Sequence, residues 1–201
     1  MLKVGLTGGM ACGKTFVAAT LARLGCYIVE ADEVAHEVIA PGGEAYDAVI
    51  AAFGKDILDG EKRIDRAVLA ARVFNQPEEL DRLNGIVHPA VRTRALRDFA
   101  DIGARDAHAV VVYVAAILIE SGAWREVDKI IVVSCTREQQ MARAMHRPGA
   151  TEAGVYSRLE RQMAVDEKKK FADYVIDTSG EKEDTVRQTE RIYDELRRLA
   201  G

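Results

Sequence analysis

Short apolar runs alternate along the chain with segments whose apolar residues recur at helical spacing. Two of these runs, 110–114 and 130–133, are continuously apolar, which is typical of strands covered on both faces of a sheet. Strands that alternate with helices favour a parallel sheet flanked by helices on both sides. The pattern therefore predicts an α/β fold with five strands, at residues 4–7, 26–29, 109–114, 130–134 and 174–176.

The stretch between the second and third strands is far longer than one crossover needs, and its pattern is helical. Asp65 is placed to cap a helix, and Pro77 is placed to begin one. Pro89 costs a continuous helix about 3 kcal/mol, so we expect a break at His88-Pro89 and a second helix from there. The pattern predicts an inserted helical subdomain at about residues 32–105, within a core at about 1–31, 106–140 and 172–201.

A second irregular stretch, at about residues 141–171, is rich in Arg and Lys and contains Pro148-Gly149. The capping-box pattern Thr136-Arg137-Glu138-Gln139 begins the helix that leads into it. We expect this stretch to form a mobile helical flap, here called the lid. An amphipathic helix near the C-terminus then closes the fold.

Composition narrows the class of protein. Of the 201 residues, 48% are apolar and 30% are charged, and the net charge is −4, which disfavours a general binder of nucleic acid or anionic membranes. No apolar run reaches the roughly 20 residues that a membrane helix needs. Three cysteines without C-x-x-C spacing and the absence of an N-terminal signal pattern indicate the cytoplasm. A monomer or a small homo-oligomer is expected.

The stretch Gly8-Gly9-Met10-Ala11-Cys12-Gly13-Lys14-Thr15 joins the first strand to a helix. In that context a glycine-bounded loop ending in Gly-Lys-Thr cradles nucleotide phosphates. Lys14 supplies charge for the β- and γ-phosphates of ATP, and the Thr15 hydroxyl can ligate Mg²⁺. The remaining predicted contacts to ATP are mainly through backbone groups, at Gly9, Ala11, Cys12, Gly13 and Phe16.

Asp32 follows the carboxyl end of the second strand, where ligands bind in open parallel sheets. A carboxylate there can orient an acceptor hydroxyl, accept its proton or hold a water on Mg²⁺. The alternative is that Asp32 only caps the helix beginning at Glu33.

Arginines of the lid are candidates to stabilise charge on a transferring phosphoryl group, because guanidinium groups bind phosphate oxygens. They are Arg147, Arg158 and Arg161, although an arginine taken alone is more often a solvated surface residue. The run Lys168-Lys169-Lys170 is more typical of a solvated helix face. His88 is either a ligand contact or a structural hydrogen-bonding residue.

With these residues laid out, the chain resembles the dephospho-coenzyme A kinase family over essentially its whole length. The resemblance is carried by several motifs in order: Gly5-Leu6-Thr7-Gly8-Gly9 with Gly13-Lys14-Thr15, Ala31-Asp32, Leu83-Asn84 with His88-Pro89, Leu118-Ile119-Glu120, Arg147, Gln162-Met163, and the stretch Ala172-Asp173-Tyr174-Val175-Ile176-Asp177-Thr178-Ser179-Gly180. The phosphate loop is shared by many NTPases, whereas the last stretch and the His-Pro element are far more specific.

The resemblance implies a P-loop kinase that transfers the ATP γ-phosphoryl group to the 3′-hydroxyl of dephospho-coenzyme A. It implies that Lys14 and Thr15 bind ATP and Mg²⁺, that Asp32 activates or orients the hydroxyl, and that Arg147 clamps ATP from the lid. It also places four residues toward the acceptor: Asn84, His88, Leu118 and Glu120.

The chain departs from the family pattern at several positions. Val114-Ala115-Ala116 stands where the family has Asp-x-Pro, so a carboxylate expected after the third strand is missing. Glu30 replaces the first Asp of Asp-Ala-Asp, and Pro148 follows the lid arginine where Asp is usual. Two alternatives stay open: another small-molecule or nucleotide P-loop kinase, and a non-catalytic module that binds ATP or coenzyme A.

Overall fold

The computed structural model describes residues 1–73 and 76–201, without the side chain of Arg161. The chain divides into two compact units. The first unit comprises Met1–Val29 and Phe99–Gly201, and the second comprises Glu30–Asp98. No helix in the described ranges is both long enough and apolar enough to cross a membrane.

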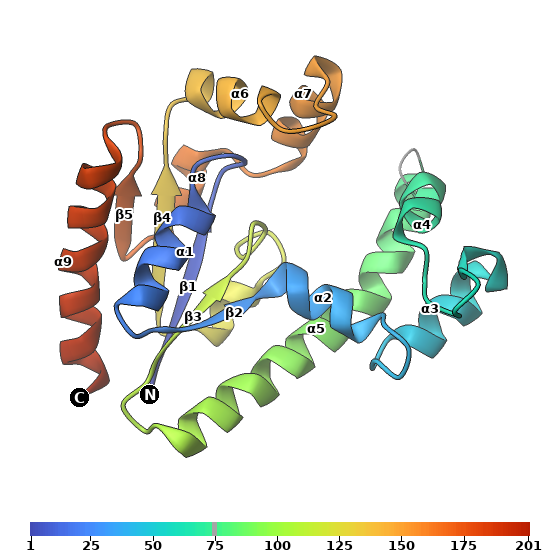
Figure 1. Ribbon diagram of the computed structural model, residues 1–201, viewed down its shortest axis with the longest axis horizontal. Helices are drawn as coiled ribbons and strands as arrows, with labels where there is room; N and C mark the ends of the chain where they lie inside the picture. Colours follow the sequence, from blue (N-terminus) through green and yellow to red (C-terminus); the bar gives the residue numbers. More distant parts are fainter. Residues whose placement is uncertain (74–75) are drawn as a thin grey trace. The chain divides into compact units, whose positions relative to one another are not determined.

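The sheet has five parallel strands in the order β2-β3-β1-β4-β5, which confirms the predicted α/β fold (Figure 1). β1 is central, and its Val4 pairs with Val112 of β3 and Lys129 of β4. Strands β1, β3 and β4 are almost wholly buried, and the continuous apolar runs of β3 and β4 predict this. The strands are β1 (Leu2–Gly8), β2 (Tyr27–Glu30), β3 (Val110–Val114), β4 (Lys129–Ser134) and β5 (Tyr174–Asp177).

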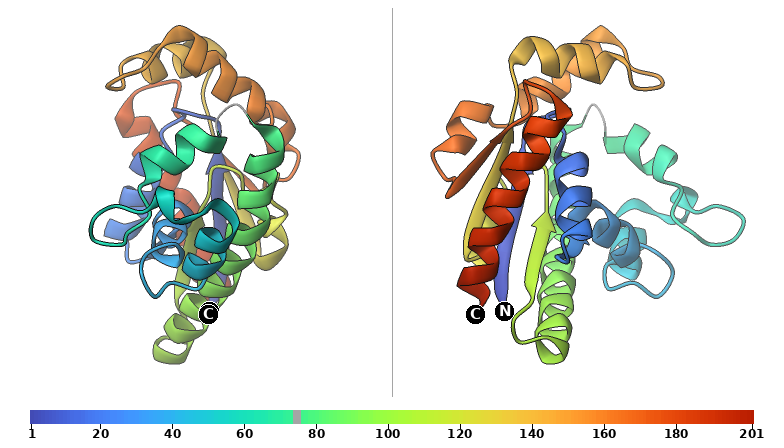
Figure 2. Two further views of the ribbon diagram at one scale, coloured as in Figure 1. Left: turned by 90° about the vertical axis from the view of Figure 1, so that its right-hand side faces the viewer. Right: turned by 60° about the vertical axis from the view of Figure 1, so that its left-hand side comes forward.

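Two helices of the first unit pack against this sheet. α1 (Lys14–Arg23) packs beside α9 (Lys182–Ala200), and the pair buries Leu21 and Leu196 against the strands (Figure 2). The capping box at Thr136 is formed as predicted and begins α6. The others are η2 (Ala123–Glu126), α6 (Arg137–Met145), α7 (Glu152–Arg161) and α8 (Val165–Lys169).

The second unit is helical apart from one isolated bridge, Leu58 to Ile64. Asp65 accepts hydrogen bonds from the backbone N–H groups of Ala67 and Val68, which confirms it as a helix cap. Its elements are α2 (Ala31–Val38), α3 (Tyr46–Phe53), η1 (Lys55–Ile57), α4 (Arg66–Val73) and α5 (Pro77–Arg105), of which α5 continues into the first unit.

The predicted break at His88-Pro89 is wrong, because α5 is continuous and contains Pro89. A proline removes the hydrogen bond to the carbonyl four residues earlier, which here belongs to Gly85. Gly85 is exposed, so water can satisfy that carbonyl. The flanking turns of a helix of 29 residues offset the local cost.

Candidate active site

The phosphate loop connects the last residue of β1, Gly8, to the first residue of α1, Lys14. Gly13 caps the helix with φ of 87°, a left-handed conformation that glycine adopts without strain. Ala11 is also left-handed, with φ of 59°, which costs a residue with a Cβ atom some strain. The predicted strand, loop and helix are therefore present, and the N-terminus of α1 opens onto the loop.

Lys14 folds along the loop, and its Nζ donates to the carbonyls of Gly8 and Gly9 at 3.0 and 3.1 Å. Thr15 and Phe16 are exposed on the first turn of α1. The ammonium group, the first-turn N–H groups and the Thr15 hydroxyl thus belong to one short segment. Such a segment can bind a polyphosphate and present one hydroxyl to a cation.

Cys12 is a fully buried residue of the phosphate loop, and its Sγ atom lies 3.2 Å from Sγ of Cys135. Burial, together with the neighbouring Cys12 thiol, raises the pKa of Cys135 to about 12. Both cysteines are free thiols. Cys12 therefore joins the loop to the residue that follows β4.

Sequence reasoning missed the contacts between the loop and α6. Met10 is buried among Ala144 of α6 and Val155 and Leu159 of α7. Gln140 is buried beside it and donates to the Met10 carbonyl. An apolar residue at the tip of a phosphate loop was the available signal, because a solvated loop would not need one.

Arg143 is a second residue that the sequence reasoning did not select. Its guanidinium group donates to Oγ1 and to the carbonyl of Thr178, at 3.1 and 2.7 Å. The Thr178 hydroxyl in turn donates to the Cys12 carbonyl at 2.9 Å. Arg143 and the segment after β5 therefore support the phosphate loop from the side of the core.

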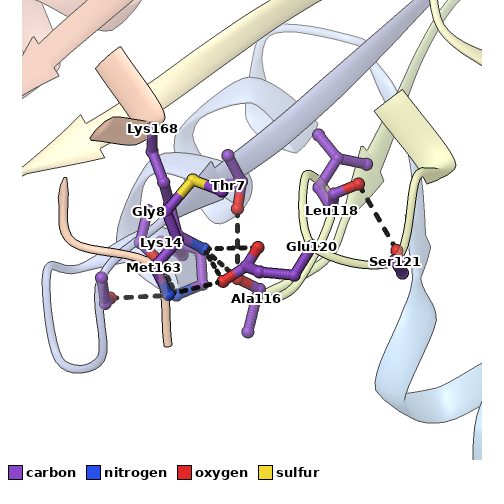
Figure 3. A network of polar contacts seen from close by, with 10 residues as sticks. Thr7, Gly8, Lys14, Ala116, Leu118, Glu120, Ser121, Met163 and Lys168 are labelled. Carbon is purple, nitrogen blue, oxygen red and sulfur yellow. Dashed lines mark hydrogen bonds and ion pairs between the residues drawn. The ribbon is translucent and has the colours of Figure 1, made fainter. Parts of the chain in front are cut away.

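At the carboxyl end of β3, the Glu120 carboxylate forms an ion pair with Lys168, with 2.9 Å between Oε1 and Nζ (Figure 3). Lys168 is fully buried, so the expectation of a solvated Lys168-Lys169-Lys170 face is wrong at its first residue. Lys168 faces inward because it finds two acceptors there, which offsets the desolvation of its charge. Leu118, from the same loop, is also fully buried.

Asp32 lies in the first turn of α2 and is exposed. The residue at the cap position is Glu30, so the interpretation of Asp32 as the helix cap is wrong. Asn84 and His88 lie four residues apart on α5, which places them on the same helix face. His88 is exposed as a residue, yet partial burial of its ring lowers its pKa below 6.5.

The candidate lid arginines are on the surface where the structure describes them. Arg147 is exposed just after α6, and Arg158 is exposed on α7. The side chain of Arg161 lies outside the described part of the chain. In Figure 1, α6 and α7 lie beyond the carboxyl end of β4, at the same end of the sheet as the phosphate loop.

The family model described as dephospho-CoA kinase matches residues 2–184. The chain belongs to the dephospho-CoA kinase family. A curated dephospho-CoA kinase of Geobacter metallireducens is 44% identical over 195 residues, which cover 97% of this chain and 96% of the relative. A second, from Geobacillus kaustophilus, is 44% identical and covers 93% of this chain and 92% of the relative.

Among solved structures, dephospho-CoA kinase from Campylobacter jejuni has a TM-score of 0.75 and is 26% identical, with 98% of each chain covered. The family membership and the fold therefore agree. Within the described residues, no group of three His, Cys, Asp or Glu side chains is placed to hold a metal ion.

Proposed function

We propose that this chain transfers the γ-phosphoryl group of ATP to the 3′-hydroxyl of dephospho-coenzyme A, which gives coenzyme A and ADP. The observation that carries the proposal is the match to the dephospho-CoA kinase model from residue 2 to residue 184. The Gly8–Lys14 loop, closed by a left-handed Gly13, supplies the nucleotide site that this reaction requires.

The phosphate loop acts on the donor. Its N–H groups and the N-terminus of α1 bind the phosphates, and the Lys14 ammonium exchanges the Gly8 and Gly9 carbonyls for phosphate oxygens. Mg²⁺, when bound, neutralises charge on the phosphate oxygens. The exposed Thr15 hydroxyl fits this ion, which usually takes one or two protein ligands beside phosphates and water.

Asp32 acts on the acceptor. Its exposed carboxylate orients the ribose 3′-hydroxyl and accepts the proton as the O–H bond breaks. The hydroxyl oxygen forms a bond to the γ-phosphorus while the bond from that phosphorus to the bridging oxygen breaks, and the electron pair stays with ADP. Arg147 closes on the phosphates from the lid and stabilises the charge on the transferred group.

The predicted acceptor residues differ in what they offer a ligand. Asn84 and His88 share one face of α5 and have accessible surface, so they are the side-chain contacts that we propose for dephospho-coenzyme A. Partial burial lowers the pKa of His88 and so favours its neutral imidazole, which suits a hydrogen-bonding role. Glu120 is held by Lys168 and Leu118 is buried, so both support the loop after β3.

A coupled assay of ADP release with a panel of acceptors tests the proposal. Release that depends on dephospho-coenzyme A is the expected result. Release with a nucleoside monophosphate but not with dephospho-coenzyme A would favour another P-loop kinase. ATP binding without any 3′-phosphorylated product at high enzyme concentration would favour a non-catalytic module.

A further inference from the structure

Lys168 is unlike its neighbours Lys169 and Lys170. Its side chain is 0% exposed, whereas theirs are 40% and 66% exposed and pair with Asp166 and Glu167 of the same helix. A buried ammonium group is costly unless charged and polar partners compensate it. The burial of Lys168 is therefore maintained by what it contacts.

Lys168 contacts the loop that follows β3 at two points. Its Nζ donates to the Ala116 carbonyl at 2.6 Å and to Oε2 of Glu120 at 3.1 Å (Figure 3). The Lys168 ammonium group thus binds both a backbone carbonyl and an acidic side chain of the loop after β3. This is the loop whose Val114-Ala115-Ala116 departs from the Asp-x-Pro of the family pattern.

Ala116 also connects this loop to the strand that leads into the phosphate loop. The Ala116 carbonyl also accepts a hydrogen bond from the Thr7 hydroxyl, at 3.3 Å. Thr7 directly precedes Gly8, whose carbonyl accepts from the Lys14 ammonium. Hydrogen bonds and the peptide bond between Thr7 and Gly8 therefore connect Lys168 to the phosphate loop (Figure 3).

Glu120 extends the network in the other direction. Its Oε1 atom accepts a hydrogen bond from the backbone N–H of Met163, at 3.0 Å. Met163 lies between α7 and α8, within the lid. The Glu120 carboxylate, which is 23% exposed, therefore connects the segment between α7 and α8 to the loop after β3.

We propose that Lys168 is a positioning residue for phosphoryl transfer, which holds the loop after β3 and, through Glu120, the segment between α7 and α8 in position relative to the phosphate loop. The inference rests on the proposed function, because it concerns the alignment of that reaction. Phosphoryl transfer depends on the alignment of the reacting groups more than on covalent chemistry by the protein. Displacement of these segments therefore lowers turnover. ATP affinity depends mainly on the phosphate loop itself and changes less.

Four variants test the role: Lys168→Met, Glu120→Gln, the double variant, and Lys170→Met as the control on the exposed face of the same helix. We expect Lys168→Met to lower kcat by up to roughly 100-fold, a loss typical of misplaced reacting groups, with a much smaller change in the Kd for ATP. Lys170→Met should retain the activity of the unsubstituted protein.

The double variant separates alignment from charge balance. It restores electrical neutrality, because neither the cation nor the anion is present, so we expect its stability to recover while kcat stays low. Recovery of kcat together with stability would overturn the proposal, as would full kcat in Lys168→Met. Either result would show that Lys168 only neutralises Glu120.

Hydrogen exchange of the Met163 amide in the unsubstituted protein gives a test that needs no variant and no turnover. Slowed exchange is expected, because the amide donates to Glu120. Exchange at the rate of an unprotected amide would overturn the link to the lid. Failure of the unsubstituted protein to phosphorylate dephospho-coenzyme A would instead count against the proposed function, and the exchange result would still decide this link.

Discussion

Gln140 donates a hydrogen bond from Nε2 to the Met10 carbonyl, with 3.1 Å between nitrogen and oxygen. The donor belongs to α6, the helix that leads into the lid, and the acceptor belongs to the phosphate loop. Gln140 Nε2 also lies 3.1 Å from Sγ of Cys12, and the Gln140 residue is 6% exposed. A buried amide therefore holds the tip of the loop at two points.

Replacing Gln140 with Leu should weaken both stability and nucleotide binding. The substitution leaves the Met10 carbonyl without its donor, and an unsatisfied buried polar group costs about 1–3 kcal/mol. We expect a decrease of that size in the free energy of unfolding by urea and a higher Kd for ATP. Ala142→Ser, at an exposed position of α6, is the control. Unchanged values for Gln140→Leu would contradict a role for this hydrogen bond.

Cys26 makes stability depend on pH in alkaline solution. Burial raises its pKa from 9.0 to about 12, although Arg197 opposes the shift. Above pH 9 the unfolded chain loses this proton while the folded chain keeps it, so the free energy of unfolding decreases as the pH rises. Below pH 9 the contribution is fully present.

Urea unfolding between pH 7 and pH 10 measures this effect. We expect the decrease in the free energy of unfolding above pH 9 to be smaller in Cys26→Ala than in the unsubstituted protein. The loss of the sulfur contacts should lower the stability of the variant by the same amount at every pH. The same slope in both proteins would show that Cys26 does not contribute. The buried thiol should also react with iodoacetamide only slowly at pH 8 until the protein is unfolded.

Asp32→Asn tests the acceptor side of the site. The amide keeps the size of the side chain but cannot accept the proton, so we expect kcat to decrease by about 10²- to 10⁴-fold. The Kd for ATP should change little, because the phosphate loop is intact. Glu33→Gln removes the neighbouring exposed carboxylate in the same turn and is the matched control. If both variants keep full turnover, the role of Asp32 is wrong.

Lys14→Ala tests the donor side. The side chain ends on loop carbonyls at the ligand site, so its removal should lower turnover by at least about 100-fold, as expected for loss of a preorganised charge. Thermal stability should change little. Lys182→Ala, at an exposed lysine of α9, is the control. Full turnover in Lys14→Ala would refute the phosphate-loop assignment.

The order of elements and the phosphate loop could be predicted from the sequence because both depend on local patterns. Continuous apolar runs identified the buried strands, and the Gly-Lys-Thr ending identified the loop between β1 and α1. The cap at Asp65 and the capping box at Thr136 are likewise short-range features. The error at Pro89 arose because the propensity of one residue was weighed without the long helix on either side of it.

The supporting contacts of the loop could not be predicted in this way. Gln140 contacts a residue 130 positions earlier, and Lys168 contacts a loop about 50 positions earlier, so sequence spacing carries no signal for either pair. Lys168 also lies in a run of three lysines, where exposure is the ordinary outcome. Only the tertiary structure shows which of the three is buried.

Identification of the phosphorylated product is the most direct test of the proposed function. The protein is incubated with ATP, Mg²⁺ and dephospho-coenzyme A, and the product is analysed by chromatography and mass spectrometry beside authentic coenzyme A. We predict coenzyme A and ADP in equal amounts, with almost none from Lys14→Ala. ATP hydrolysis without coenzyme A, or phosphorylation of dephospho-coenzyme A at another position, would contradict the proposal.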